Sequence, residues 1–507
     1  MSHRPSGRIG KVYLVGAGPG DPELMTLRAA ECLGRADLVV YDGLVNPAIV
    51  ESRPPSARAT CLAHRNSDGT LERAPTEQGS ALVIEAARNG QTVVYLKGGD
   101  PEVFGHTAEE TEALAAAGIP FEIVPGVTAA TAASAYAEIP ITHGQHASSV
   151  ALVTGREQRD KLGAPLDYRA LAGFPGTLVF YMGESSAEVW SQALIEGGKP
   201  PQTPVAIVRR CTWPDQETIR CTLATVADVV AQRGARPPMV IVVGEVVGLA
   251  RDVSWFTGRP LSGKTILLTR PREQVAGMQR RLEELGAEVL VQPAIRIGEP
   301  ADWAPVDAAL GRLNHYDWLV FSSVNGVRYL LNRLLCLGGD LRQLAASKLA
   351  VIGPATADEL RRYHLRADLV PRQYCAEALA EALAGDARTR RFLLVRASRG
   401  RELLAEQLAA AGGEVDQIVA YRSVDEQKPR PEVSAAMAAG QLDWTTVTSS
   451  AIARSLVALF GEGLQKTRLA SISPITSAAL KELGLEPAIE ATEYTTDGLV
   501  DAMMARG

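Results

Sequence analysis

Five segments in the first half of the chain bring glycine and other small residues to places where a β-branched run gives way to a turn. They span residues 12–26, 96–105, 125–130, 177–183 and 240–247. Glycine permits positive φ angles and a close approach of the backbone to a ligand. In an α/β sheet, such turns meet at the carboxyl edge of the strands, where ligands bind. The pattern therefore predicts a small-molecule site, although the G-x-G-x-G spacing at 16–20 alone favours only a structural turn.

The second half contains short predicted strands that end in serine, threonine or glycine and lead directly into a helix. They cover residues 321–327, 351–356, 394–401, 447–451 and 471–476. Free N–H groups at a helix start bind anions, so several such starts around one ligand suit a molecule with many carboxylates. A helix N-cap role explains each serine or threonine equally well, and the two roles are compatible.

Two further motifs match known sites in spacing only. Residues 258–265 fit the G-x-x-x-x-G-K-[ST] pattern of a phosphate-binding loop, but such a loop follows a buried strand and opens a helix. Here residues 265–269 are predicted to form a strand, so the segment is interpreted as an interdomain linker. His143 and His146 have H-x-x-H spacing, but no third ligand is evident, and we predict no metal.

Predicted strands and helices alternate along the chain, which is typical of an α/β protein with mostly parallel sheets. The predicted strands of the first half cover 12–15, 38–41, 92–96, 150–154, 177–181, 205–208 and 239–243. Those of the second half cover 265–269, 319–322, 349–352, 392–395, 446–448 and 469–472. Glycine and proline cluster between 255 and 264, which places the main boundary near residue 260.

The bulk properties exclude several classes of protein. The 507 residues predict about three or four compact domains. A net charge of −6 argues against nucleic-acid binding, which needs a basic surface. Six cysteines without a C-x-x-C pair, and a start without an apolar core, predict a reduced cytoplasmic protein. The longest apolar stretch, 239–250, is too short to span a membrane and contains Glu245.

Taken in order, the motifs of the first half resemble the uroporphyrinogen-III C-methyltransferases of the tetrapyrrole methylase family over residues 8–257. The similarity includes residues 36–42 and 134–143. It implies two α/β lobes with S-adenosylmethionine (SAM) in the cleft between them, and S-adenosylhomocysteine as product. The resemblance assigns the SAM site to Pro19, Gly98, Gly99, Asp100, Val103, Thr128, Ala129, Met182 and Cys211. It also implies that Asp42 accepts the proton that leaves after a ring carbon attacks the methyl group.

Four positions depart from the family pattern. His64 replaces the lysine proposed as proton donor, and histidine can do acid work near neutral pH. His106 and Gly144 replace arginines, and Cys211 stands where a glycine is expected near the adenine pocket. The exact tetrapyrrole substrate is therefore left open. An ordinary surface role for His64 and a strand-end cap role for Asp42 remain alternatives.

The second half resembles uroporphyrinogen-III synthase over residues 264–507, after a linker of residues 258–263. The resemblance implies two α/β lobes joined by a pair of strands: lobe one covers about 264–298 plus 423–507, and lobe two about 299–421. The implied substrate, hydroxymethylbilane, carries eight carboxylates. Tyr421 matches the family tyrosine thought to assist loss of the substrate hydroxyl, with ordinary packing as the alternative. The expected substrate-binding residues are Ser322, Ser323, Asn325, Thr356, Arg396, Ser449, Ser450 and Thr476.

Both resemblances together predict a bifunctional enzyme of tetrapyrrole biosynthesis. The second half would cyclise hydroxymethylbilane to uroporphyrinogen III, and the first would methylate it twice with SAM to precorrin-2, toward sirohaem or cobalamin. The methylase family implies a homodimer through that domain, with small tetrapyrroles as ligands and no nucleic acid, membrane or metal. Two alternatives remain: the methylase half acts on another tetrapyrrole, or it is a degenerate tetrapyrrole-binding module that does not catalyse.

Overall fold

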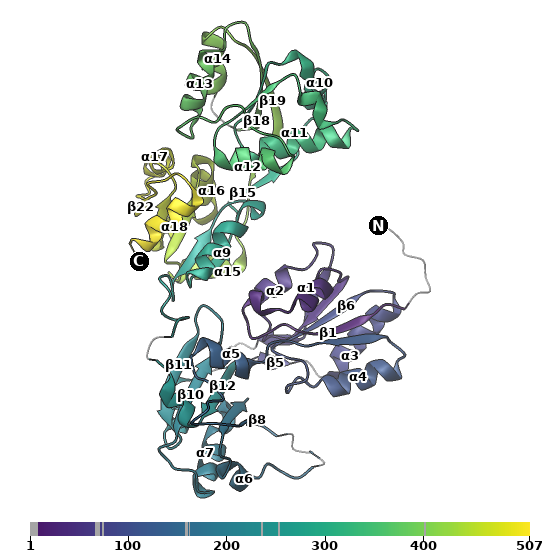
Figure 1. Cartoon of the computed structure of the whole chain (residues 1–507), viewed down its shortest axis with the longest axis vertical. Coiled ribbons are helices and arrows are strands. Elements are labelled where there is room, and N and C mark those ends of the chain that lie inside the picture. Colours follow the sequence, from purple (N-terminus) through teal and green to yellow (C-terminus); the bar gives the residue numbers. More distant parts are fainter. Residues whose placement is uncertain are drawn as a thin grey trace. The chain divides into compact units, whose positions relative to one another are not determined.

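The computed structural model describes residues 9–65, 71–73, 76–157, 161, 163–234, 237–251, 254–399 and 402–506. The chain forms two compact units, Met1–Gly263 and Lys264–Gly507. Within the described residues each unit contains two five-stranded sheets, and the first also contains a two-stranded hairpin (Figure 1). We name the four sheet-based lobes N1 and N2 in the first unit, and C1 and C2 in the second.

Lobe N1 is built on a fully parallel sheet in the order β3-β2-β6-β1-β7. Its strands are β1 (Val12–Gly16), β2 (Leu38–Tyr41), β3 (Arg58–Cys61), β6 (Val93–Lys97) and β7 (Phe121–Val124), with the hairpin β4 (Ala63–Arg65) and β5 (Leu71–Arg73). Its helices are η1 (Pro22–Leu24), α1 (Leu27–Leu33), α2 (Pro47–Glu51), α3 (Thr76–Arg88) and α4 (Thr107–Ala116).

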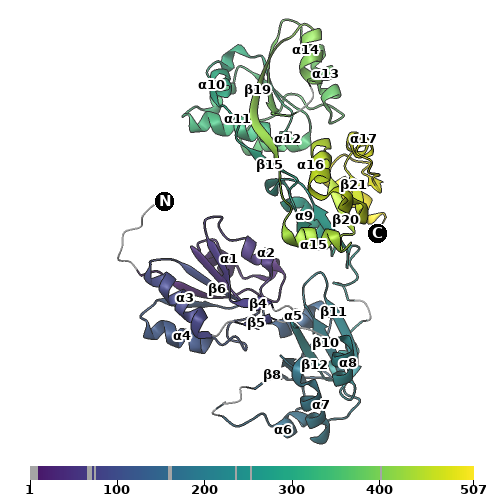
Figure 2. The ribbon, with the colours of Figure 1, turned by 180° about the vertical axis from the view of Figure 1, so that it is seen from behind.

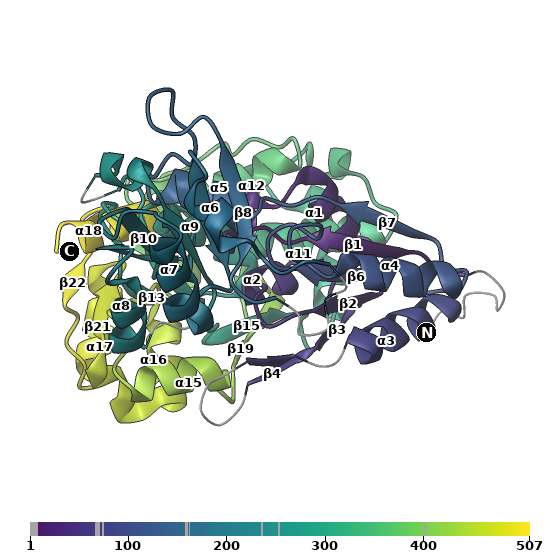
Figure 3. The same cartoon turned by 90° about the horizontal axis from the view of Figure 1, so that it is seen from below.

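Helices cover both faces of the N1 sheet, which explains why its central strands are apolar throughout. Val15 and Leu96 pack with residues of α1 and α2 on one face. Leu14 and Tyr95 pack with residues of α3 and α4 on the other. Figure 3 shows α3 and α4 next to each other along this second face. Because both faces of the sheet are covered by helices, ligand-binding groups of N1 are expected at the strand ends.

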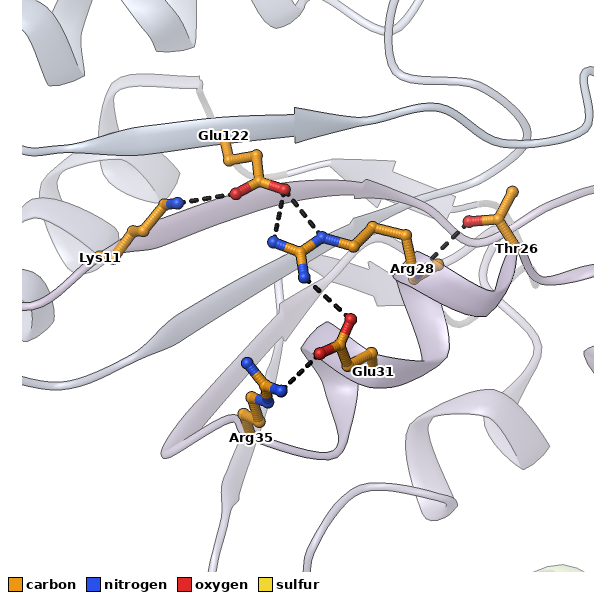
Figure 4. A network of polar contacts seen from close by, with 7 residues as sticks. Lys11, Thr26, Arg28, Glu31, Arg35 and Glu122 are labelled. Atoms are coloured by element: carbon orange, nitrogen blue, oxygen red, sulfur yellow. Dashed lines mark hydrogen bonds and ion pairs between the residues drawn. The ribbon is translucent and has the colours of Figure 1, made fainter.

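A polar network fastens α1 to the sheet of N1 (Figure 4). Glu122 on β7 accepts hydrogen bonds from Lys11 Nζ at 2.7 Å and from Arg28 Nε and Nη2 at 2.9 and 2.7 Å. Arg28 also donates to Glu31 at 2.9 Å, and Glu31 pairs with Arg35. Hydrogen bonds from Lys11 and Arg28 lower the pKa of Glu122. Because these groups lie near the surface, the network sets the position of α1 more than it stabilises the fold.

Lobe N2 contains a mixed sheet in the order β11-β10-β12-β9-β8. Its strands are β8 (Val150–Thr154), β9 (Thr177–Tyr181), β10 (Pro204–Arg209), β11 (Glu217–Thr222) and β12 (Met239–Val243). Its helices are α5 (Ala129–Tyr136), α6 (Tyr168–Ala172), η2 (Glu184–Ser186), α7 (Ala187–Glu196), α8 (Val226–Arg233) and η3 (Glu245–Leu249).

The prediction of mostly parallel sheets is wrong for N2. Only β8 and β9 pair in parallel, whereas β9, β12, β10 and β11 pair antiparallel in that order. For β10 and β11 the reason is the short connection over residues 210–216 between them. A parallel pair needs a crossover of a dozen or more residues, whereas a short turn suffices for an antiparallel pair. The sequence analysis also missed β11 itself.

Residues 258–265, which match a phosphate-binding loop in spacing, lead into a strand and not into a helix. Thr265 is the first residue of β13, and Leu261 is fully buried. A phosphate-binding loop needs the free N–H groups of a following helix. The geometry of this segment therefore supports its interpretation as a connection and not as a nucleotide site.

Lobe C1 has a parallel sheet in the order β14-β13-β20-β21-β22. The strands are β13 (Thr265–Leu268), β14 (Glu288–Val291), β20 (Trp444–Val447), β21 (Arg468–Ser471) and β22 (Ile489–Glu490). The helices are η4 (Arg272–Gln274), α9 (Ala276–Glu284), α15 (Pro431–Ala438), α16 (Ser450–Phe460), η7 (Gly461–Lys466), α17 (Pro474–Glu482) and α18 (Thr496–Met504).

Lobe C2 has the sheet order β15-β19-β18-β16-β17, parallel except for β15. The strands are β15 (Ile295–Gly298), β16 (Trp318–Phe321), β17 (Lys348–Val351), β18 (Arg391–Ala397) and β19 (Glu414–Asp425). The helices are α10 (Ala304–Leu310), η5 (Leu313–His315), α11 (Val324–Cys336), η6 (Leu341–Leu344), α12 (Pro354–Arg362), α13 (Ala376–Ala384) and α14 (Leu403–Ala410).

The antiparallel strands β15 and β19 join the two lobes of the second unit. Ile295 pairs with Asp425 and Gly298 with Arg422. Figure 2 shows β19 as the long strand that runs out of C2 toward β15. β15 hydrogen bonds within the C2 sheet, while the side chain of Ile295 packs in the core of C1. None of the helices in the described ranges is long and apolar enough to cross a membrane.

Candidate functional site

In lobe N1, the carboxyl ends of β1, β6 and β7 approach so closely that only glycine fits between them. A Cβ atom on Gly16 would lie 2.6 Å from the backbone N and Cα of Gly126. A Cβ atom on Gly126 would lie 2.2 Å from the carbonyl oxygen of Gly99. The structure therefore brings together the glycines of three predicted motifs at one edge of the sheet, as expected for a ligand-binding edge.

Asp100 holds these turns together. Its Oδ1 accepts a hydrogen bond from the N–H of Glu102 at 2.8 Å, and its Oδ2 accepts one from the N–H of Gly126 at 2.9 Å. Gly99 and Gly18 exchange backbone hydrogen bonds of 2.7 and 3.1 Å, which hold the turn after β1 against the turn after β6. The Asp100 carboxylate thus shapes the edge through backbone contacts.

A buried ion pair lies at the base of the same loop. Lys97 ends β6 and Glu110 lies in α4, and their side chains are 3% and 2% exposed. Lys97 Nζ also donates a hydrogen bond of 2.6 Å to the carbonyl oxygen of Gly105. The pair therefore closes the loop over residues 98–106, which contains the predicted SAM residues Gly98 and Val103. The sequence analysis did not single out either ion.

Tyr181, at the end of β9, connects the loop of N1 with lobe N2. Its hydroxyl lies 2.7 Å from Thr128 Oγ1 and accepts a hydrogen bond from the N–H of Ala130 at 2.9 Å. Its ring packs against Phe104, with centroids 5.0 Å apart. Burial raises the pKa of Tyr181, so the phenol stays protonated at neutral pH. The predicted pair Thr128 and Ala129 thus lies at a contact between the lobes.

The turn that contains Pro19 lies against lobe N2 as well. The N–H of Asp21 donates to Thr212 Oγ1 at 2.9 Å. The indole of Trp213 packs on Gly20, where a Cβ atom would lie 2.1 Å from Nε1. Gly20 has a φ of +148°, so both its conformation and its neighbour require glycine. Pro19 is therefore held in a fixed turn between the lobes.

Several residues around these contacts have a left-handed backbone that is unfavourable for them. Their φ angles are 55° for Phe104, 56° for His106, 53° for Met182, 46° for Arg210 and 70° for Thr212. Each such residue costs about 1–3 kcal/mol, and such strain concentrates at functional sites. The cluster therefore marks this edge as the candidate site of the first unit.

Cys211 lies within this strained segment, and its side chain is buried. It packs in the N2 core with Val208 and Val240, and burial raises the pKa of its thiol to about 12. The thiol therefore stays neutral and behaves as a small apolar group. This explains how the position accepts a side chain where the family has glycine.

Asp42 follows β2 directly and is half-buried. Its Oδ1 accepts a hydrogen bond of 2.9 Å from the N–H of Leu44, as a capping carboxylate would. The backbone of His64 lies in β4, opposite Glu72, but its side chain falls outside the described residues. Gly144 lies between His143 and His146 in the chain, and the rings of these two histidines are 5.0 Å apart. Within the described ranges, no three His, Cys, Asp or Glu residues could together hold a metal ion.

The side chains at this edge fit SAM. Phe104 and Met182 are apolar, yet they are 37% and 39% exposed, which suits contact with an adenine ring. Trp213 Nε1 is buried against Gly20 and has no hydrogen-bond partner in the described part of the chain. Gly98, Gly99 and Gly126 are half-buried and carry no side chain, so a ligand can approach the backbone of this edge closely.

In the second unit, Tyr421 is buried at the carboxyl end of the C2 sheet. Its hydroxyl lies 2.8 Å from Ser323 Oγ. Burial raises the pKa of Tyr421, while hydrogen bonds with Ser323 and Asn325 oppose the rise. Its ring is stacked with that of Tyr329 at 5.8 Å. The structure thus brings together three of the predicted residues, Tyr421, Ser323 and Asn325.

Other predicted residues lie at helix starts. Ser323 caps α11 and Ser449 caps α16, through hydrogen bonds of 3.1 and 3.2 Å from Gly326 and Ile452 N–H groups. Ser450 is the first residue of α16, and Thr476 is buried near the start of α17 behind the cap Ser473. The N-cap role is therefore present at Ser323 and Ser449, and free N–H groups remain at these helix ends.

Three further predicted residues of lobe C2 make contacts with groups other than Tyr421. Thr356 is buried in α12, and Ser322 Oγ donates to the carbonyl oxygen of Val395 at 3.4 Å. Arg396 pairs with Glu402 and donates to Gln417 at 2.7 Å. Arg396 also pairs in the sheet with Val419, two residues before Tyr421.

Two protein families match the chain, one in each unit. The family described as Tetrapyrrole (Corrin/Porphyrin) Methylases matches residues 11–227, and Uroporphyrinogen-III synthase HemD matches residues 276–501. A relative from Ruminiclostridium josui, the "Porphyrin biosynthesis protein HemD", is 32% identical over 501 residues, 98% of either chain. The chain belongs to the family of fused tetrapyrrole methylases and uroporphyrinogen-III synthases. We call its units the methylase half and the synthase half.

Two further similarities concern the methylase half. An "S-adenosyl-L-methionine-dependent uroporphyrinogen III methyltransferase" from Methanosarcina barkeri is 43% identical over 244 residues, 48% of this chain and 94% of that one. A crystal structure of "Uroporphyrin III C-methyl transferase" from Thermus thermophilus is 36% identical, covers 47% of this chain and 94% of that one, and has a TM-score of 0.40. The predicted fold class, a methylase fold followed by a synthase fold, is confirmed.

Proposed function

We propose that this chain catalyses two consecutive steps of tetrapyrrole biosynthesis. The synthase half closes hydroxymethylbilane to uroporphyrinogen III, and the methylase half transfers two methyl groups from SAM to give precorrin-2. The observation that carries this proposal is the similarity to a porphyrin-biosynthesis protein along the whole chain. We assign methyl transfer to residues 8–257 and ring closure to residues 264–507, with 258–263 as the connection.

In ring closure, Tyr421 is proposed to help the substrate hydroxyl leave. Its raised pKa keeps the phenol protonated, so it can donate a hydrogen bond to the departing oxygen. Ser323 and Asn325 are positioning residues, because they hold that hydroxyl from the start of α11. The helix starts that follow Ser323, Ser449 and Ser473 present N–H groups to substrate carboxylates. Ser322, Ser450, Thr356, Thr476 and Arg396 are proposed to surround the substrate.

In methyl transfer, the residues proposed to hold SAM are Pro19, Gly98, Gly99, Asp100, Val103, Thr128, Ala129, Met182 and Cys211. SAM supplies an activated methyl group, and the contribution of the protein is mainly to position it. Asp42 is proposed to accept the proton that leaves the ring carbon, and His64 to act as the acid where relatives have lysine. The loop closed by Lys97 and Glu110 keeps the SAM-binding backbone rigid.

Each half serves as the control for the other in a test of this proposal. The full chain is given hydroxymethylbilane without SAM, and separately uroporphyrinogen III with SAM. We expect ring closure in the first reaction and two methyl additions in the second. Asp42→Asn should lose methylation and keep ring closure, because the substitution lies in the other half. Ring closure without any methyl transfer would instead support a degenerate methylase half. Methyl transfer only to a different tetrapyrrole would support the altered specificity suggested by His106 and Gly144.

The proposal extends to assembly and location. We propose a homodimer through the methylase half and a cytoplasmic enzyme. The six cysteines are all free, which suits a reducing compartment. Sedimentation of the full chain tests the dimer, and fractionation of the native cell tests the location.

A further inference from the structure

Arg270 is a half-buried cation that lacks an acidic partner among the described residues. It follows β13 at the carboxyl edge of lobe C1. Its Nε is buried without a hydrogen-bond partner, and its Nη2 donates at 2.9 Å to the neutral amide of Gln274. Burial lowers the pKa of Arg270, and no carboxylate among the described residues raises it. Burial of a charge without a counter-charge is costly, so a fold does not retain one for stability.

Arg328 in the same unit shows the usual arrangement. Its guanidinium donates two hydrogen bonds of 2.7 and 2.9 Å to Glu359, whose side chain is 6% exposed. The Glu359 hydrogen bond raises the pKa of Arg328. Arg270 has the same fork of donors but only an amide oxygen to bind. Its fork is therefore open to an anionic group that the described residues do not supply.

A chain of hydrogen bonds places Arg270 beside the contact between the lobes. Gln274 accepts from Arg270 and donates at 3.3 Å to Asn325 Oδ1 in lobe C2. Asn325 also hydrogen bonds to Tyr421, which is held by Ser323. The guanidinium of Arg270 is thus connected through two side chains, Gln274 and Asn325, to the phenol assigned to ring closure.

The neighbours of Arg270 in the sheet also suit an anion. The preceding residue, Thr269, is fully buried and donates to the carbonyl oxygen of Thr446 on β20 at 2.6 Å. The chain then leaves β20 through Ser449, the cap of the long helix α16. A helix start and an arginine fork at one sheet edge are both donors to carboxylates.

We propose that Arg270 binds a side-chain carboxylate of the linear tetrapyrrole through its guanidinium fork, and that Gln274 and Asn325 tie this contact to Tyr421. The inference rests on the proposed ring-closure function of the synthase half. A guanidinium matches a carboxylate with two parallel N–H···O bonds, which an ammonium does not reproduce. Arg270 is a substrate-binding residue that holds a group away from the reacting carbon.

The test uses the full chain without SAM and compares Arg270→Met with Arg270→Lys and Arg280→Gln. Arg280 is a matched control, because it is an exposed arginine on the neighbouring helix α9. We expect Arg270→Met to raise the KM for hydroxymethylbilane about 10- to 100-fold, as a lost charge-assisted hydrogen bond predicts. The value of kcat should change much less, since the contact is equally strong in the ground and transition states. Arg270→Lys should recover part of the loss, and Arg280→Gln should stay within about twofold.

Thermal unfolding without ligand separates substrate binding from a structural role. Because Arg270 has no counter-charge, Arg270→Met should leave the Tm of the synthase half unchanged or raise it. A KM within twofold of the wild type, or a lower Tm with unchanged KM, would overturn the inference. Failure of the wild type to close the ring would refute the proposed function instead. The unfolding comparison needs no activity, so it would still show whether Arg270 is an uncompensated cation.

Discussion

Ser323 Oγ and the Tyr421 hydroxyl lie 2.8 Å apart, although 98 residues separate them in the chain. Ser323 caps α11, and Tyr421 lies on β19. The contact therefore joins a helix start of lobe C2 to the longest strand of that lobe. One oxygen thus serves both as helix cap and as support for a buried phenol. This relationship explains why a helix start and a tyrosine far along the chain belong to one site.

Substitution of Tyr421 tests its role in ring closure. Tyr421→Phe keeps the packing with Tyr329 and removes only the hydroxyl, so we expect kcat for ring closure to fall about 10²- to 10⁴-fold. Ser323→Ala should lower kcat less and should also destabilise the unit by about 1 kcal/mol, because α11 loses its cap. Initial rates and denaturant unfolding measure both effects. Unchanged kcat in Tyr421→Phe would assign the tyrosine to packing alone.

Removal of the Tyr181 hydroxyl should weaken SAM binding. Tyr181→Phe leaves the N–H of Ala130 without its acceptor and releases Thr128, at a cost of about 1–3 kcal/mol in stability. We expect a several-fold higher Kd for SAM by calorimetry. Tyr168→Phe is the control, since Tyr168 lies on α6 away from this group. Equal SAM affinity in the two variants would contradict the role of Tyr181.

Removal of one ion of the buried pair Lys97 and Glu110 should destabilise the fold more than removal of both. Lys97→Met leaves a buried carboxylate without its cation and should cost about 3–5 kcal/mol of stability. The double variant Lys97→Met with Glu110→Leu should recover most of that loss, because no charge stays buried. Unfolding in urea of the single and double variants measures the difference. A double variant less stable than Lys97→Met would show that the two ions act independently.

Asp425 should make the synthase half sensitive to acid. Its carboxylate receives two hydrogen bonds of 2.8 Å from Arg399 and one of 2.5 Å from Ser455 on α16, and the pKa of Asp425 is lowered, chiefly by Arg399. A lowered pKa stabilises the fold above the unfolded value of about 3.9, and the stabilisation is lost as pH falls below it. Because Asp425 is a third exposed, the effect should be under about 1 kcal/mol.

Unfolding in denaturant at pH 7 and at pH 3 tests this role. The wild type should lose more stability between the two values than Asp425→Asn, which cannot ionise. Asp302→Asn is the control, because Asp302 only caps a local turn at Ala304. The same pH dependence in wild type and Asp425→Asn would show that the Asp425 carboxylate does not cause the loss of stability in acid.

The sequence predicted much of the fold, since strand periodicity is a local property. β2, β8, β9 and β12 occupy the predicted residues, and the other predicted strands differ from the observed ones by one or two positions. The antiparallel N2 sheet was not predicted, because strand pairing depends on which segments meet in space. Several strands were not predicted, among them β3, β11 and β14. β11 is mostly half-buried and has only two apolar residues, Ile219 and Cys221, so its sequence gives a weak signal.

Residues of the candidate sites could be predicted from the sequence where they directly follow a predicted strand. The Gly99, Asp100 and Gly126 cluster follows from such motifs. Lys97 and Glu110 were not found, because an isolated lysine and glutamate carry no sign of burial. Arg270 directly follows the predicted strand 265–269, yet its lack of a counter-ion is visible only when every neighbouring carboxylate is located.

The central claim is that one chain converts a linear tetrapyrrole into a twice-methylated macrocycle. The most direct measurement gives the purified chain hydroxymethylbilane and SAM labelled in its methyl group, and follows the product by mass spectrometry. We predict a cyclised product that has lost water and gained two labelled methyl groups. A cyclised product without label, or a linear product with or without label, would contradict the claim.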